Sequence, residues 1–273
     1  MKAIYKPKGK AGEYARWACN FFTGCSNDCS YCYCKKYPLS KVWTPFPKLK
    51  KAFKDENDAF RTFCREVEAN ADTIQADGSI FFSFSTDPCL PETLQLTLKC
   101  VEYASVMFGV PCQILTKCID WANTPDAISL LSFKNSYAPI SIGMTITGLD
   151  NMETNSPSND ERLRTLLDIR KRYSHPVFIS AEPVVDFSSA LPLLLRAIDG
   201  GVDLIKVGLM SGKDSYDTYE TTLFANRLVL FAEKKGNTKL YFKDSIRKVM
   251  NGSYKFYDSK KVCVGADYSI FSK

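Results

Sequence analysis

The chain has 273 residues, 45% of them hydrophobic, with 36 basic and 30 acidic side chains and a formal charge of +6. This length and apolar content fit one large α/β domain and exclude global disorder. Eleven cysteines, an odd number, in a chain this long argue against a disulfide-stapled secreted scaffold. The N-terminus lacks an apolar signal core, and no run approaches the ~18 apolar residues that span a bilayer. We therefore expect a cytoplasmic protein without membrane contact.

Short apolar runs rich in β-branched and aromatic residues predict buried strands. In chain order they are Tyr14–Asn20, Ser79–Phe84, Gln113–Thr116, Pro139–Ile146, Val177–Ala181, Leu204–Leu209 and Lys239–Phe242. Helical spacing predicts helices at Lys48–Ala69, Thr93–Phe108, Ala122–Phe133, Asp160–Tyr173, Phe187–Ile198 and Tyr219–Lys235. Ser158, followed three residues later by Glu161, is a capping box and predicts a helix start.

The alternation of strands and helices predicts a parallel sheet with right-handed crossovers. Six or seven such units favour an α/β fold of the partial (β/α)6-7, TIM-like barrel type. Ligands of such folds bind at the carboxyl ends of the strands. We predict one domain over residues 1–273, with residues 245–273 as a C-terminal extension. Its tail, Lys255–Lys273, is expected to add a strand or cover a sheet edge.

Three cysteines with the spacing Cys-x3-Cys-x2-Cys follow the first predicted strand, at Cys25, Cys29 and Cys32. Three thiolates within eight residues can hold one face of a [4Fe–4S] cluster and leave its fourth iron open. One alternative is a structural zinc site, which needs a fourth ligand such as Cys19 or Cys34. Another is chance clustering in a cysteine-rich chain.

The spacing of Cys25, Cys29 and Cys32 resembles that of the radical S-adenosylmethionine (SAM) superfamily. The wider segment 20–33, NFFTGCSNDCSYCY, resembles its spore photoproduct lyase-like (DNA repair photolyase-like) branch. The resemblance implies a [4Fe–4S] cluster whose open iron binds SAM, and an external electron donor of the flavodoxin or ferredoxin type. One electron then cleaves SAM to a 5′-deoxyadenosyl radical, which abstracts hydrogen from the substrate. It also implies a cofactor contact for Tyr31, beside the third cysteine.

Two strand ends carry candidate SAM contacts. Ser85, Thr86 and Asp87 follow the second strand and resemble the TDP motif of the same branch, where superfamily members bind the SAM amino group. Their alternative role is a turn that opens a helix. Ser141 and Thr145 lie on one face of the fourth strand, which in the superfamily often meets the ribose or methionine of SAM. The alternative is that they are ordinary strand residues that bind no ligand.

Charged residues at later strand ends are candidates for the pocket. Glu182 ends the fifth strand, while Lys206 and Lys243 lie in or after the next two. Because a charge inside an apolar strand is costly unless it is paired or faces a wet cavity, we predict that these three line the substrate or SAM pocket. A structural ion pair is the alternative. Glu161 resembles a family position near SAM, although a helix cap also explains it.

Cys89, just past the second strand, is a candidate hydrogen donor to a product radical. Spore photoproduct lyases use a cysteine near this strand, but the matching position here is Phe84, which has no thiol. That departure puts the lyase reaction itself in doubt. The alternative for Cys89 is an unreactive helical cysteine.

The first function predicted is radical modification or repair of a nucleic-acid base. It rests on the resemblance and on the mild positive charge, although no dense Lys/Arg stripe is predicted. The second is a radical SAM enzyme acting on a peptide or small metabolite. A third, of another class, is a zinc-stabilised α/β binding protein without catalysis. The sequence makes no prediction of oligomeric state.

Overall fold

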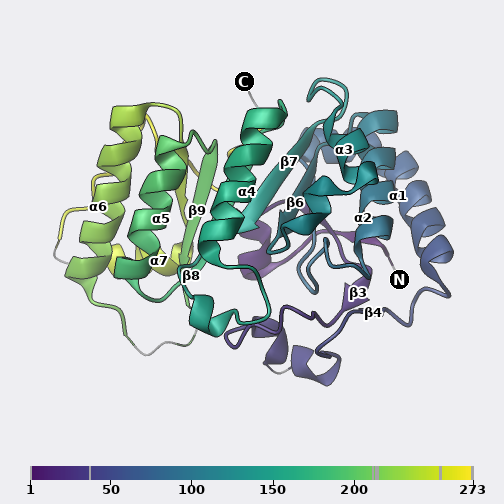
Figure 1. Cartoon of the computed structure of the whole chain (residues 1–273), viewed down its shortest axis with the longest axis horizontal. Coiled ribbons are helices and arrows are strands. Elements are labelled where there is room, and N and C mark those ends of the chain that lie inside the picture. The colour runs from purple at the N-terminus through teal and green to yellow at the C-terminus, as the bar shows by residue number, and fades with distance from the viewer. Residues whose placement is uncertain (1, 37, 211, 213–214, 252–253, 272–273) are drawn as a thin grey trace. The chain divides into compact units, whose positions relative to one another are not determined.

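A computed structural model describes residues 2–36, 38–210, 212, 215–251 and 254–271 of the chain (Figure 1). The chain divides into two compact units, each described here by itself. Unit 1 comprises Met1–Ile142, Asn151–Pro157 and Arg172–His175, and unit 2 comprises Gly143–Asp150, Ser158–Lys171 and Pro176–Lys273. The division falls inside β7 (Ile140–Thr145).

Unit 1 places the carboxyl ends of three parallel strands at one edge. Its strands follow the order β1 (Ile4–Tyr5), β2 (Trp17–Cys19), β5 (Ile80–Phe82) and β6 (Cys112–Thr116). β1 is antiparallel to β2, while β2, β5 and β6 run parallel, with Cys19 opposite Phe82 and Phe82 opposite Ile114. The loops that follow β2, β5 and β6 therefore lie side by side, as expected for a ligand site of a parallel sheet.

The helices of unit 1 begin at recognisable caps. α1 (Glu56–Asp77) starts after Asp55, whose carboxylate accepts a 2.8 Å hydrogen bond from Asp58 N. The predicted helix began eight residues too early, because Lys48–Leu49 forms β4 and pairs with β3 (Phe22–Thr23). The other helices are α2 (Leu94–Glu102), which continues as a π-helical turn at Tyr103–Met107, and α3 (Pro125–Leu131).

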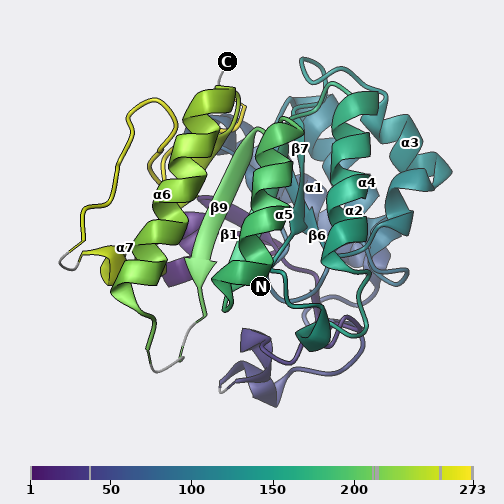
Figure 2. The same cartoon turned by 60° about the vertical axis from the view of Figure 1, so that its left-hand side comes forward.

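Unit 2 repeats the strand–helix alternation. β8 (Val177–Val184), β9 (Leu204–Leu209) and β10 (Lys239–Phe242) are neighbours in that order and parallel. The helices are α4 (Asn159–Arg172), α5 (Phe187–Asp199), α6 (Thr218–Lys235) and α7 (Asp244–Met250). α5 and α6 lie side by side, as Figure 2 shows. The predicted capping box is present, because Ser158 N and Oγ donate to a Glu161 carboxylate oxygen at 2.8 and 2.7 Å.

The C-terminal segment contacts β10 through backbone hydrogen bonds. Leu240 of β10 donates to the carbonyl of Val262 at 2.8 Å and accepts from Val264 N at 2.9 Å. Residues 252, 253, 272 and 273 of the predicted extension lie outside the described residues. None of the helices that the structure describes has the length and apolar character needed to cross a bilayer. The predicted α/β class and all seven predicted strands are confirmed, with β9 and β10 at the predicted bounds.

Candidate functional site

The three motif cysteines lie in a tightly packed loop of unit 1. Cys25 N donates a 3.1 Å hydrogen bond to the carbonyl of Thr44, which anchors the start of the loop. Gly24 has φ +84°, and a Cβ on it would lie 2.4 Å from the Phe46 carbonyl oxygen. No larger residue fits there without displacing backbone. Asp28 also has a left-handed backbone, at φ 44°. The backbone around the cysteines therefore forms a tight loop with two left-handed residues.

The thiols of this loop respond to one shared cation. All eleven cysteines are free thiols. Burial raises the pKa of Cys25 to about 12 and also raises that of Cys29, whereas a hydrogen bond from the Cys34 thiol lowers the pKa of Cys32 to about 6. The ammonium of Lys117 favours the thiolate at Cys25, Cys29 and Cys32 alike. The three sulfurs therefore lie within electrostatic reach of the same side chain.

Lys117 belongs to a buried charged group that the sequence interpretation missed. Its Nζ lies 3.9 Å from a Glu153 carboxylate oxygen and 5.6 Å from the centre of the Tyr31 ring. The Glu153 side chain has no exposed surface and accepts a hydrogen bond from the Tyr31 hydroxyl. Lys117 follows β6 directly, and a charged residue at the carboxyl end of a parallel strand is a candidate for the site. The sequence could therefore have identified Lys117. Glu153 stands in a polar loop, where no periodicity indicates burial.

The Asp87 carboxylate accepts four hydrogen bonds from other groups of the protein. One carboxylate oxygen accepts from Cys89 N at 3.0 Å and from the Thr116 hydroxyl at 2.6 Å. The other accepts from the Asn27 side-chain amide and from Lys117 N, each at 2.8 Å. Since a carboxylate offers about four lone-pair sites, all are occupied. Asp87 thus joins the cysteine loop to the ends of β5 and β6, an arrangement that favours a positioning role over the predicted SAM contact.

Two predicted SAM contacts are buried hydroxyls without a protein partner. Thr86 Oγ1 and Ser141 Oγ form no hydrogen bond within the described residues. Because a buried hydroxyl without a partner is costly, these groups fit a site that a polar ligand completes. Ser85 differs, since its hydroxyl donates to the Phe22 carbonyl at 2.6 Å. Thr145 is buried in unit 2, and its carbonyl accepts a 2.7 Å hydrogen bond from the fully buried Arg162.

Cys89 is not a helical residue. It lies in the turn before α2, which begins at Leu94, so its alternative role as a helical cysteine is wrong. Its side chain is buried and contacts the Thr116 hydroxyl, with Cys118 nearby, and burial raises the pKa of its thiol. The role of hydrogen donor stays a prediction.

Unit 2 contains the ion pair that the sequence allowed. Lys243 Nζ lies 2.6 Å from a Glu182 carboxylate oxygen, with side chains 1% and 21% exposed, respectively. Gly208 makes room for the pair, because a Cβ there would lie 2.8 Å from the Glu182 carboxylate. Lys206 is buried on β9, opposite Ser180 of β8 in the strand register. Glu161 is exposed and makes the contacts of a helix cap.

Breaking this pair from one side is expected to destabilise the protein. Lys243→Met or Glu182→Gln should each lower the free energy of unfolding by about 3 kcal/mol, because each leaves a largely buried charge without its counter-ion. The double variant should lose less than the sum of the two, measured by urea unfolding. Lys248→Met, on the exposed side of α7, is the control. Strictly additive losses would show that the two side chains do not stabilise each other.

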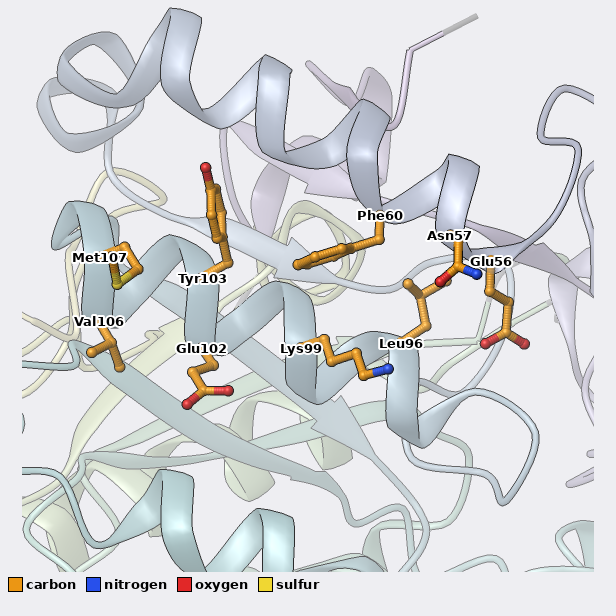
Figure 3. Close-up of a pocket in the computed structure, with 9 residues that line it drawn as sticks. All are labelled: Glu56, Asn57, Phe60, Leu96, Lys99, Glu102, Tyr103, Val106 and Met107. Carbon is orange, nitrogen blue, oxygen red and sulfur yellow. The ribbon is translucent and has the colours of Figure 1, made fainter.

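A separate pocket of about 420 Å³ lies between α1 and α2 (Figure 3). It is lined by Glu56, Asn57, Phe60, Leu96, Lys99, Glu102, Tyr103, Val106 and Met107. None of these residues belongs to the cysteine loop or to the strand ends described above. The pocket is therefore a surface crevice between two neighbouring helices.

The sequence left two kinds of metal site open, a single zinc ion and an iron–sulfur cluster. Within the described residues, no group of three or more His, Cys, Asp or Glu side chains could hold one metal ion. Zinc draws its sulfur ligands to about 2.3 Å from one centre, whereas an iron–sulfur cluster spreads its thiolate ligands over several irons. The Cys34 thiol, a candidate fourth zinc ligand, contacts Cys32, and the choice between the two kinds of site stays a prediction.

No protein-family profile and no curated protein matches the sequence. Among solved structures, a spore photoproduct lyase complexed with dinucleoside spore photoproduct aligns with a TM-score of 0.58 and 14% identity, over 88% of this chain and 79% of the lyase. Streptococcus suis SuiB bound to S-adenosylmethionine aligns with a TM-score of 0.51 and 13% identity, over 71% of this chain and 46% of SuiB. SuiB bound to the precursor peptide SuiA aligns with a TM-score of 0.54 and 14% identity, over 86% of this chain and 52% of SuiB.

These alignments show that the chain has the α/β fold of radical SAM enzymes. The particular likeness that covers most of both chains is to spore photoproduct lyase, so the predicted fold type is confirmed. The chain spans about half the length of SuiB.

Proposed function

We propose that the protein is a radical SAM enzyme in which Cys25, Cys29 and Cys32 hold a [4Fe–4S] cluster. The observation that carries the proposal is the arrangement of these free thiols in one tight loop, which packs through Gly24 and Cys25 N against the backbone of Thr44 and Phe46. The proposal is supported by the position of this loop after β2, which runs parallel to β5. When bound, the cluster supplies the electron that cleaves SAM.

Each nearby side chain has a role that its contacts support. Lys117 places a positive charge beside three thiolates, and Glu153 and Tyr31 hold that ammonium in place. Thr86 and Ser141 offer buried hydroxyls to the polar groups of SAM. Asp87 and its partners fix the loop, a role that we assign in place of direct contact with SAM. Thr145 and Glu161 remain predicted SAM contacts.

The first substrate class we propose is a nucleic-acid base. The lyase structure that aligns over most of both chains holds a dinucleoside, which supports this class. The second is a peptide, supported by the alignment with peptide-bound SuiB. Cys89, Glu182, Lys206 and Lys243 are the residues we propose to act on the substrate. An external flavodoxin- or ferredoxin-type donor and a cytoplasmic location suit a site built on reduced thiols.

The test is anaerobic purification and reconstitution, followed by incubation with SAM and dithionite. We expect a brown protein with about four irons per chain and, by mass spectrometry, 5′-deoxyadenosine and methionine in excess of a control without reductant. Binding of one zinc without colour, or iron loading without SAM cleavage, would refute the proposal. Deuterium transfer between labelled oligonucleotide or peptide and 5′-deoxyadenosine would then identify the substrate class.

A further inference from the structure

One segment of the protein is rich in basic residues and contains no acidic ones. Residues 29–54 contain seven of the 36 basic side chains and no Asp or Glu, which leaves 29 basic against 30 acidic residues elsewhere. The chain total of +6 does not reveal this local excess. We call residues 29–54 the basic segment; its lysines are Lys35, Lys36, Lys41, Lys48, Lys50, Lys51 and Lys54.

Most of these lysines are exposed, while two hold the segment in place. Lys35 pairs with Asp28, and Lys50 donates to the Asn20 carbonyl at 2.6 Å. The remaining five are exposed. Three of them, Lys48, Lys51 and Lys54, form no ion pair with any residue that the structure describes. Unneutralised ammonium groups that are this close in sequence attract a polyanion.

Exposed rings and apolar side chains lie among these cations. Tyr33 is 53% exposed and Phe46 is 49% exposed. Lys48 Nζ lies 4.8 Å from the centre of the Phe46 ring, and Lys35 Nζ lies 4.9 Å from that of Trp43. Aromatic rings alternating with lysines are the composition of sites that bind single strands, where bases stack and phosphates pair with cations.

The basic segment overlaps the cysteine loop, because it includes Cys29 and Cys32. Thr44 accepts the hydrogen bond from Cys25 N, and the missing side chain of Gly24 lets the Phe46 backbone approach. In Figure 1 the part of the segment that precedes β4, drawn in violet, lies below β3 and β4. A polymer bound along it would therefore run beside the cysteines.

We propose that the basic segment binds single-stranded nucleic acid, with Lys48, Lys51 and Lys54 on phosphates and Phe46 and Tyr33 stacked on unpaired bases. Charge complementarity favours a polyanion, and the exposed rings favour unpaired bases over duplex. An acidic protein fits less well, because protein interfaces are depleted in lysine and collect their aromatic residues in a dry centre. The inference adds to the proposed function the polymer that carries the substrate.

The test measures binding of a fluorescent oligothymidylate to the full chain at several salt concentrations, with and without the cluster. We expect salt-sensitive binding, with a logarithmic salt slope that falls by about 2 in a Lys48→Gln/Lys51→Gln/Lys54→Gln variant, at about 0.7 per lost phosphate contact. Phe46→Ala should weaken binding about tenfold, and an abasic strand should not respond to that substitution. A Lys99→Gln/Lys134→Gln/Lys171→Gln variant, altered at exposed lysines outside the segment, should bind like the parent.

Three results would overturn the inference. They are an absence of binding, an equal loss in the two triple variants, and equal affinity for abasic and base-containing strands. Segment-dependent binding of an acidic flavodoxin without oligonucleotide binding would also refute it and assign the surface to the electron donor. Because oligonucleotide binding does not use the cluster, a protein that binds strands but does not cleave SAM would refute the proposed function alone.

Discussion

Serine in place of Cys25, Cys29 or Cys32 is expected to abolish 5′-deoxyadenosine formation. Each substitution leaves two thiolates where a cluster with one open iron needs three, and a serine hydroxyl is a poor ligand for iron. Iron per chain should fall from about four to well under one after desalting, with loss of the brown absorbance. Colorimetric iron assay and mass spectrometry of the SAM products measure the two effects separately.

The controls are cysteines close to and far from the loop. Cys34 contacts the Cys32 sulfur and the Phe84 carbonyl. The Cys34→Ser variant therefore tests whether a cysteine close to the motif is needed for iron binding. Cys64→Ser alters a half-buried thiol on α1. Both variants should keep iron and activity. Should Cys34→Ser lose iron while one motif variant retains it, the ligand set would have to be redrawn to include Cys34.

The sequence predicted the elements of the fold better than their ends. β9 and β10 match their predicted bounds, because each is a short, mostly apolar run that starts after a polar residue, Asp203 or Thr238. α1 was misplaced because Lys48–Leu49 is too short to show a strand period, and the cap signal at Asp55 was overlooked. β1 was missed for the same reason, since two residues cannot reveal alternation.

The site was predictable where chemistry is local and not where it depends on partners from other elements. The cysteine spacing is visible within eight residues, and the ion pair of Glu182 with Lys243 was open to inference as charges at strand ends. In contrast, the burial of Glu153 beside Tyr31 joins positions 122 residues apart. The four donors around Asp87 likewise come from three loops, so their convergence is a property of the fold.

Asp87→Asn is expected to destabilise the protein and loosen the cysteine loop. The asparagine amide is nearly isosteric with the carboxylate, but its nitrogen cannot accept a hydrogen bond. Two of the four hydrogen bonds are therefore lost, and the two donors that made them then face the N–H groups of the amide. At about 1.5–3 kcal/mol for each bond to a charged group, the loss should be about 3 kcal/mol or more. Anaerobic urea unfolding of the cluster-free chain measures it. Because Asn27 lies between Cys25 and Cys29, the reconstituted variant should also lose iron to a chelator several times faster.

A pair of measurements separates positioning by Asp87 from direct recognition of SAM. If the carboxylate positions the loop, stability and iron retention fall together, and the affinity for SAM of the surviving loaded protein changes little. If it instead binds the SAM ammonium, Asp87→Asn weakens SAM binding while unfolding and chelator kinetics stay close to the parent. Asp72→Asn, an exposed carboxylate on α1, should alter none of these quantities, with stability within about 0.5 kcal/mol of the parent. The four occupied acceptor sites of Asp87 favour the first outcome, because a further donor would have to displace one that the fold already supplies.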